Sequence, residues 1–246
     1  MTRRYFSPEL PPAGGSVALS TEESQHAIRV MRLQLGDQVT LFDGNGAEAE
    51  AEVIDLGRNR CELQVQTVHL ISREPWCEVE MAIALPKPDR ARELIERLTE
   101  LGVKSVTPVI AQRTQRPPSA SLLQKLQRGV IEACKQCQRN QLLEVHDPRP
   151  SLEFFAEQQS GVCWIAHPTE SCQSIVAAGS LGKVTAAIGP EGGWTEEETA
   201  IAIENGYQAI DLGKRIYRIE TAATVIASVL TMAGESRCER SNLDPD

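Results

Sequence analysis

The segment Ile188-Gly189-Pro190-Glu191-Gly192-Gly193-Trp194-Thr195-Glu196-Glu197-Glu198 decides the fold class of the larger part of the chain. An apolar run, Val184–Ile188, enters a turn that holds three glycines within five residues. Thr195 and Glu198 then have the spacing of a capping box, in which each side chain accepts a backbone N–H of the other, so a helix should begin here. A strand followed by a tight turn and a helix is the repeating unit of an α/β domain.

Strands and helices alternate on both sides of this segment, over residues 76–235. The alternation predicts an α/β domain with a mainly parallel sheet. We expect strands at Val79–Leu85, Ser105–Ala111, Gly161–Ala166, Val184–Ile188 and Gln208–Leu212, and helices at Pro88–Leu101, Ser119–Arg139, Thr195–Asn205 and Glu220–Ala233. Open α/β sheets bind ligands beyond the carboxyl ends of their strands, so the glycine-rich turn is a candidate ligand site. The alternative is a tight strand-to-helix turn that holds no ligand.

Residues 1–72 follow a different pattern of short β-prone runs, which predicts a small β-barrel interrupted by one helix. Asp43-Gly44-Asn45-Gly46 is a strong turn signal between two of the runs, and Thr21 is positioned to cap the helix. Ser72–Pro75 has the composition of a linker. We therefore predict domains at residues 1–72 and 76–235, followed by a polar tail at 236–246. The β-prone runs are Arg4–Phe6, Ser16–Leu19, Gln38–Phe42, Glu48–Leu56 and Cys61–Val68.

The composition is that of an ordinary globular protein, because 41% of the 246 residues are hydrophobic and 24% are charged. No apolar run reaches the ~18 residues that a membrane span needs. The N-terminal Met1–Tyr5 lacks the apolar core of a signal peptide. We therefore expect a cytoplasmic protein that has no membrane contact.

The seven cysteines do not predict a disulfide framework, because their number is odd and their spacing is irregular. Cys134 and Cys137 form one C-x-x-C inside a helical pattern, with no second pair and no nearby histidine in the sequence. Metal and redox sites of this type need such partners. We therefore expect free thiols and no metal site.

Charge is distributed unevenly along the chain, whose net charge is −9. The segment from Lys87 to Arg139 contains eleven Lys and Arg residues but five Asp and Glu residues. A basic segment in an acidic protein favours a surface that faces phosphates, although a solvated helical face gives the same pattern. Both readings stay open on charge alone.

The glycine-rich turn does not match the loops that hold phosphates. The chain has neither G-x-x-x-x-G-K-[S/T] nor G-x-G-x-x-G, Pro190 lacks an N–H donor, and Glu191 would repel a phosphate. A ligand that carries positive charge suits this turn better. A second informative segment, Leu212–Ala223, places three cations just before Glu220 at the start of the last expected helix, and a basic surface loop is the alternative reading.

These two segments together resemble the motifs of the SPOUT methyltransferases, and more closely those of the bacterial small-subunit (16S) ribosomal RNA (uracil-N3) methyltransferases. Members of that family carry G-P-E-G-G after a strand and L-G-x-R-[IVL]-L-R-x-E-T-A at the last helix. Gly189–Gly193 matches the first motif fully. Leu212–Ala222 matches the second motif and differs from its common form at Lys214, Tyr217 and Ile219.

The N-terminal Arg3-Arg4-Tyr5-Phe6 and the stretch His26–Leu33 are also similar to this family, so the resemblance covers nearly the whole chain. It implies a PUA-like β-barrel that binds RNA, and a SPOUT α/β domain with a deep trefoil knot. It also implies a homodimer that transfers a methyl group from S-adenosylmethionine to N3 of a uridine in 16S ribosomal RNA, within the small ribosomal subunit and without a metal. A SPOUT enzyme acting on transfer RNA or on a ribose 2′-hydroxyl is an alternative, as is a non-catalytic RNA-binding ribosome-assembly factor.

The resemblance also implies roles for individual residues. In such folds three loops hold the donor, here His167–Thr169, Gly189–Gly193 and Leu212–Arg218, and their backbone groups hold the adenine. The donor-binding residues expected are His167, Gly189, Pro190, Glu191, Gly192, Gly193, Leu212, Gly213, Ile216, Tyr217, Arg218, Thr221 and Ala222. The RNA contacts expected are Arg3, Arg4, His26, Arg29, Arg32, Arg113 and Arg116.

Arg218 and Glu220 are the expected catalytic residues. Methylation at N3 requires loss of the N3 proton, and the negative charge that builds on the uracil oxygens suits an arginine at a helix start. Glu220 is expected to orient Arg218 or to act as the base. The alternative is that Arg218 and Glu220 form a structural ion pair.

Overall fold

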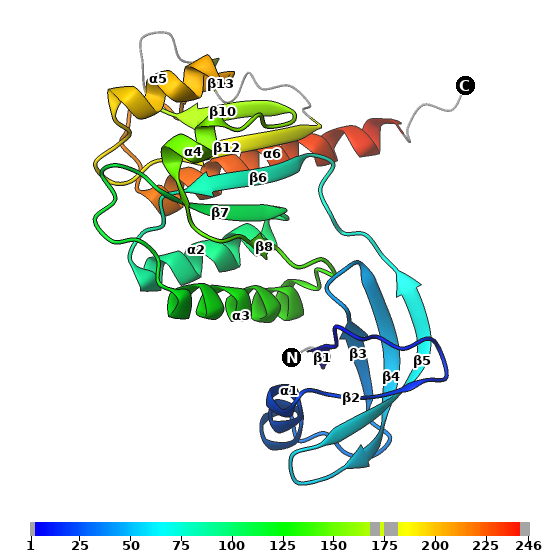
Figure 1. Cartoon of the computed structure of the whole chain (residues 1–246). Helices are drawn as coiled ribbons and strands as arrows, with labels where there is room; N and C mark the ends of the chain where they lie inside the picture. The colour runs from blue at the N-terminus through cyan, green and yellow to red at the C-terminus, as the bar shows by residue number, and fades with distance from the viewer. Residues whose placement is uncertain (1–2, 168–172, 175–181, 242–246) are drawn as a thin grey trace. The chain divides into compact units, whose positions relative to one another are not determined.

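The computed structural model describes residues 3–167, 173–174 and 182–241, which fold into two compact units (Figure 1). The first unit combines Met1–Glu74 with Ile131–Leu142, and the second combines Pro75–Val130 with Leu143–Asp246. Neither unit is one continuous stretch of the chain. The long helix α3 (Ala120–Cys137) begins in the second unit and ends in the first.

The first unit contains a five-stranded sheet in the order β1-β3-β4-β5-β2. The strand β1 pairs with β3 in parallel, and the other neighbours are antiparallel. Alternation along β4 buries its alanines and turns its glutamates outward, which is the pattern of a sheet with one face on a core. The bounds are β1 (Arg4–Phe6), β2 (Ser16–Ala18), β3 (Gln38–Phe42), β4 (Ala47–Leu56) and β5 (Cys61–Leu70).

The helix of this unit departs from the expected form. Ser20, not Thr21, caps α1 (Thr21–Gln25), since the Ser20 hydroxyl accepts the Glu23 N–H at 3.2 Å. The chain then continues as a π-helical turn, η1 (His26–Val30), in which the Met31 N–H donates to the His26 carbonyl at 3.0 Å. The wider turn accommodates one extra residue, a feature that proteins often keep at functional positions.

The second unit contains an eight-stranded sheet in the order β11-β13-β10-β12-β6-β7-β8, with β9 also paired to β7. Every pairing in it is parallel among the residues described, which confirms the predicted α/β class. The five predicted strands are present. The strands are β6 (Glu78–Ile83), β7 (Ser105–Ile110), β8 (Glu144–Val145), β9 (Arg149–Pro150), β10 (Val162–Ala166), β11 (Gln173–Ser174), β12 (Lys183–Ile188) and β13 (Tyr207–Asp211).

Helices cover this sheet in two groups (Figure 1). The helix α6 (Ile219–Ser241) packs against β6 and β12, and α2 (Pro88–Glu100) packs against α6. The short helix α4 (Ser151–Ala156) packs against α5 (Glu196–Glu204) and β7. The last helix continues past its expected end at Ala233 into the predicted polar tail, of which residues 242–246 lie outside the described part.

The carboxylate of Glu198 joins three segments of the second unit. Its Oε1 accepts the Gln112 N–H at 2.9 Å and the Ser151 hydroxyl at 2.6 Å, and its Oε2 accepts the Thr195 N–H at 2.8 Å. The Thr195 hydroxyl in turn accepts the Glu198 N–H, which completes the predicted capping box. Burial of Glu198 opposes its ionisation, but the hydrogen bonds from Ser151, Thr195 and Gln112 hold its pKa below the ordinary value.

The substitution Glu198→Gln should destabilise the second unit by about 2–3 kcal/mol at pH 7, because an amide NH2 would face donors that now meet a carboxylate. A lowered pKa stabilises the folded state fully above the ordinary glutamate pKa of 4.5, and this contribution is lost as the pH falls through the lower folded value. The difference from the parent chain should therefore shrink below about pH 4. Urea unfolding of both chains at pH 7 and below about pH 4 measures this difference in the free energy of unfolding.

The matched control is Glu196→Gln, since Glu196 is exposed in the first turn of the same helix. Its substitution should cost less than about 1 kcal/mol, the scale of a charge at a helix start. Equal losses for the two variants would contradict the role given to Glu198.

Candidate functional site

The three loops predicted to bind the donor begin side by side at the carboxyl ends of neighbouring strands of the parallel sheet. The strand β10 lies between β12 and β13, and its last residue, Ala166, pairs with both Ile188 and Ile210. The three strands therefore end at the same level (Figure 1). His167, Gly189–Gly193 and Leu212–Arg218 follow these ends directly, whereas Pro168 and Thr169 lie outside the described residues.

The glycine-rich turn is closed tightly on itself and on the core. The Gly193 N–H donates to the Pro190 carbonyl at 2.8 Å, and Gly193 has a φ of +71°, a conformation that favours glycine. A Cβ on Gly189 would lie 2.9 Å from the ring of Trp194, so this position requires a close approach. Trp194 is buried and meets the Phe155 ring edge-on at 5.2 Å between centroids, which anchors the turn to the core.

Arg113 also supports the glycine-rich turn. Its Nη1 donates to the carbonyl of Gly192 at 2.8 Å and to that of Trp194 at 3.2 Å. Arg113 is exposed, so the predicted RNA contact stays a prediction beside these backbone contacts in the turn. Arg116, three residues farther on, is exposed.

The loop Leu212–Arg218 presents both apolar and basic groups to solvent. The Gly213 N–H donates to the Asp211 carboxylate at 2.6 Å, and Gly213 has a φ of +101°. Ile216 is fully exposed, which is unusual for so apolar a side chain. Arg218 is exposed as well, and its carbonyl accepts the Ala222 N–H at 2.9 Å at the start of α6.

A residue that the sequence did not nominate connects the turn to the last helix. Arg90, in the first turn of α2, donates from Nη2 to Glu191 Oε1 at 2.9 Å and from Nη1 to Glu220 Oε1 at 3.2 Å. Two hydrogen bonds raise the pKa of Arg90, the larger contribution coming from Glu191 and the smaller from Glu220. Arg90 in turn lowers the pKa of Glu191. The helix α2 follows β6, the neighbour of β12, which is the signal that Arg90 lies near the turn.

The contact between Arg90 and Glu220 bears on the expected roles of Arg218 and Glu220, either as a catalytic pair or as a structural ion pair. The arginine that contacts Glu220 is Arg90, and the exposed Arg218 is not its ion-pair partner. Oε2 of Glu220 is buried and has no hydrogen-bond partner within the described part of the chain. A buried acceptor of this kind is costly unless a ligand or water satisfies it.

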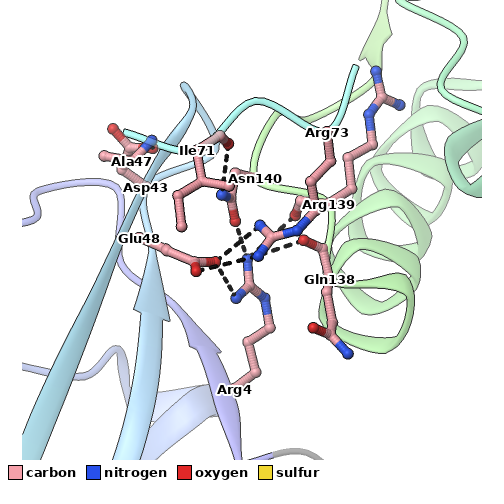
Figure 2. Close-up of polar contacts among 9 residues, drawn as sticks. All are labelled: Arg4, Asp43, Ala47, Glu48, Ile71, Arg73, Gln138, Arg139 and Asn140. Atoms are coloured by element: carbon pink, nitrogen blue, oxygen red, sulfur yellow. Dashed lines mark hydrogen bonds and ion pairs between the residues drawn. The ribbon is translucent and has the colours of Figure 1, made fainter. Parts of the chain in front are cut away.

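Arg4 in the first unit does not suit the expected phosphate contact, because only 3% of its surface is exposed. Figure 2 shows its guanidinium among polar groups of the same unit. Arg4 donates to Glu48 Oε2 at 2.9 Å, to the side chain of Asn140 and to the carbonyls of Gln138 and Arg139. These acceptors and the burial correct the prediction: Arg4 holds β1 to the segment that follows α3.

The other expected RNA contacts of this unit differ in exposure. Arg3 is partly exposed and pairs with Asp37 at 2.9 Å, and the half-buried His26 meets the ring of Tyr5 edge-on. Arg29 and Arg32 are exposed at the π-helical turn, and Arg32 has a φ of +52°, a strained value for a residue with a side chain.

Two further arginines lie near Arg29. Its Nη2 donates to Asn59 Oδ1 at 3.0 Å, and Asn59 stands between the exposed Arg58 and Arg60 in the turn from β4 to β5. The sequence gave no signal for this contact, because the two segments are thirty residues apart. The exposed Arg29, Arg32, Arg58 and Arg60 are together called the arginine surface, in which the guanidinium of Arg60 pairs with Glu62.

Other possible sites carry less chemistry. A cavity of about 370 Å³ lies over the amino-terminal halves of β6, β7 and β12, away from the three loops, and Glu80, Arg149 and Thr185 are among its lining residues. No group of three His, Cys, Asp or Glu side chains is placed to hold a metal within residues 3–167, 173–174 and 182–241. Burial raises the pKa of the Cys134 thiol to about 12. Among the described helices, none is both long and apolar enough to span a bilayer.

Comparisons with known proteins match two parts of the chain. A family model described as an RNA methyltransferase domain matches residues 72–231, and one described as an RNA methyltransferase PUA domain matches residues 19–66. The chain is 35% identical over 230 residues to ribosomal RNA small subunit methyltransferase E of Synechocystis, covering 90% of this chain and 74% of the relative. The enzyme of the same name from Bacillus subtilis is 28% identical, with 89% and 90% covered.

Solved structures extend the likeness to three dimensions. Ribosomal RNA small subunit methyltransferase E from Neisseria gonorrhoeae, bound to S-adenosyl methionine, is 31% identical with a TM-score of 0.87, over 96% of this chain and 99% of that one. A putative methyltransferase from Legionella pneumophila, in complex with the same cofactor, has the same identity and TM-score, over 95% and 98%. Sequence and fold thus agree over both units, and the chain belongs to the RNA methyltransferase family and, within it, to the ribosomal RNA small subunit methyltransferase E group.

Proposed function

We propose that this protein transfers a methyl group from S-adenosylmethionine to N3 of a uridine in 16S ribosomal RNA. The observation that carries the proposal is the meeting of three loops at the level ends of β10, β12 and β13. The family supports the reaction class, and the similar Neisseria and Legionella structures, which hold S-adenosylmethionine, support the donor. The names of the relatives favour ribosomal RNA over transfer RNA or a ribose hydroxyl.

The residues of the three loops fit a donor of this chemistry. A Cβ added to Gly193 or to Gly213 would meet nothing within 4 Å, so there is open space beside the backbone at both positions, although both N–H groups donate within their own loops. The carboxylates of Glu191 and Glu220 suit the positive sulfonium and ammonium groups of S-adenosylmethionine. We assign donor binding to His167, Gly189, Pro190, Glu191, Gly192, Gly193, Leu212, Gly213, Ile216, Tyr217, Arg218, Thr221 and Ala222. The bound donor supplies an electrophilic methyl group.

The side chains of the site would activate the acceptor. N3 of uracil carries a proton, so its N–H bond must break as the bond to the methyl group forms. Glu220 Oε2, which has no partner among the described residues, would accept that proton directly or through water. Arg218, exposed at the start of α6, would stabilise the negative charge that develops on the uracil oxygens.

The first unit would hold the RNA through the arginine surface, together with Arg3 and His26, and Arg116 would contribute from the second unit. The buried Arg4 is given a structural role instead, whereas the exposed Arg113 would contact RNA as well as support the glycine-rich turn. The substrate RNA would be met within the small ribosomal subunit in the cytoplasm. The deep trefoil knot is part of the same proposal, as are the domain bounds 1–72 and 76–235, except that Ile131–Leu142 packs with the first unit.

Titration calorimetry with S-adenosylmethionine and mass mapping of methylated 16S ribosomal RNA test the function directly.

The variant Arg218→Lys tests the catalytic role of Arg218, because it keeps the charge but loses the planar pair of donors. The single-turnover rate should fall by roughly 10²-fold, the scale of losing one donor to the transition state. The deficit should shrink as the pH rises and more uracil ionises unaided. A near-normal rate for this variant would remove Arg218 from catalysis.

Replacing both Arg29 and Arg32 by alanine should weaken RNA binding and flatten its dependence on salt. Each phosphate contact releases counterions on binding, so a variant with fewer contacts releases fewer of them. The slope of log K against log salt should decrease by roughly 0.7 for each contact on single-stranded RNA. Donor affinity should not change. Arg97→Ala, an exposed arginine on α2, is the control, and an equal loss of RNA affinity there would argue for unspecific charge.

We also propose that the protein is a homodimer that uses α6. The buried Ala223, Ile226 and Leu230 face the core, while Met232 is 63% exposed on the same helix. A helix that is apolar on more than one side is usually buried or lies at an interface. Light scattering at micromolar concentration should give twice the chain mass of 27.0 kDa, and the mass of a single chain would contradict the dimer.

A further inference from the structure

Arg90 bonds two carboxylates that are far from it and from each other in the chain. Glu191 is 101 residues away, in the glycine-rich turn, and Glu220 is 130 residues away, in the first turn of α6. Each carboxylate receives a different terminal nitrogen of the same guanidinium, at 2.9 Å and 3.2 Å. One side chain thus ties together the two segments that carry the family motifs.

The chemistry of the guanidinium explains why an arginine occupies this position. Its planar fork presents terminal N–H groups in fixed directions, so it can bind two carboxylates at the same time. A lysine carries the same charge as a compact point on a flexible stem and would not hold both partners in one geometry. Arg90 is about one-quarter exposed, so solvent screens the contacts in part.

The two contacts differ in how deeply they lie. Glu191 is 63% exposed, and an ion pair with so exposed a partner contributes little to stability. Glu220 is 12% exposed, and there the hydrogen bond fixes the direction of the carboxylate. Because Arg90 occupies Oε1, the buried Oε2 is the oxygen that stays without a partner in the described part of the chain.

We propose that Arg90 is a positioning residue for methyl transfer, acting on the reaction through Glu220 and on the donor-binding turn through Glu191. This inference rests on the proposed function. Arg90 touches neither reacting atom in this role. It holds the Glu220 carboxylate so that Oε2 faces the acceptor, and it holds the glycine-rich turn near the start of α6.

Two double-mutant cycles separate the two actions of Arg90. The variants are Arg90→Lys, Glu220→Gln, Glu191→Gln and the two doubles that contain Arg90→Lys. Arg90→Lys alone should slow single-turnover methyl transfer by roughly 10-fold or more, a typical loss for a misplaced catalytic group. In the Glu220→Gln background it should slow the reaction by less than about 2-fold, because the group through which it acts is already lost.

Donor affinity, measured by titration calorimetry, gives the second cycle. Arg90→Lys should weaken S-adenosylmethionine binding several-fold in the parent chain but hardly at all in the Glu191→Gln background. Arg97→Lys is the matched control, since Arg97 lies on the same helix and bonds Glu93 four residues before it. Arg90 effects that add in both cycles would overturn the proposal, as would equal effects of Arg97→Lys.

Hydrogen exchange distinguishes a failure of this inference from a failure of the proposed function. Arg90→Lys should speed amide exchange in Gly189–Gly193 and in the first turn of α6, and Arg97→Lys should not. This measurement needs neither donor nor RNA. If the parent chain binds no donor and methylates no RNA, the proposed function fails whatever the exchange shows. If the parent chain is active but Arg90→Lys leaves amide exchange unchanged in both segments, only the positioning role of Arg90 is rejected.

Discussion

The common direction of the strands in the second unit is the constraint on which its site depends. Parallel pairing places the carboxyl end of each strand beside that of its neighbour. Ala166 pairs with both Ile188 and Ile210, so three segments separated by more than twenty residues leave the sheet at one level. The glycine-rich turn depends on this arrangement, because the proposed donor site needs all three loops and the turn supplies only one of them. Glu198 and Trp194 then fix the turn to the core behind it.

Much of this architecture could be predicted from the sequence, because it follows from local patterns. The alternation of apolar strands and helices, and the capping box of Thr195 and Glu198, are written within short stretches and are confirmed. The cap at Ser20 and the π-helical turn after Gln25 were missed, since a shift of one residue leaves the apolar pattern almost unchanged. The two-residue strands are too short for any periodicity to reveal.

The candidate site was predictable to the extent that it consists of motifs. The arginines show where this stops, since the same side chain has different roles that depend on distant partners. Arg4 is buried among acceptors near residue 140, Arg113 supports a turn, and Arg90 joins two carboxylates. Positive charge along the sequence therefore overstates the surface that faces RNA. In an acidic protein, the cations left exposed, such as Arg29, have the clearer claim to phosphates.

The first unit is built from two segments that are far apart in the chain, and this affects the order in which the chain folds during synthesis. The guanidinium of Arg4 finds its partners at residues 138–140, and Lys135 reaches back to the buried Glu23 at 3.0 Å. When the first 74 residues emerge from a ribosome, Glu23 still lacks Lys135, and Arg4 has Glu48 but not its acceptors at residues 138–140. Buried groups without these partners oppose burial. The N-terminal sheet can therefore reach its final packing only after the Pro75–Val130 part of the second unit has been translated, although it is the first part of the protein to be made.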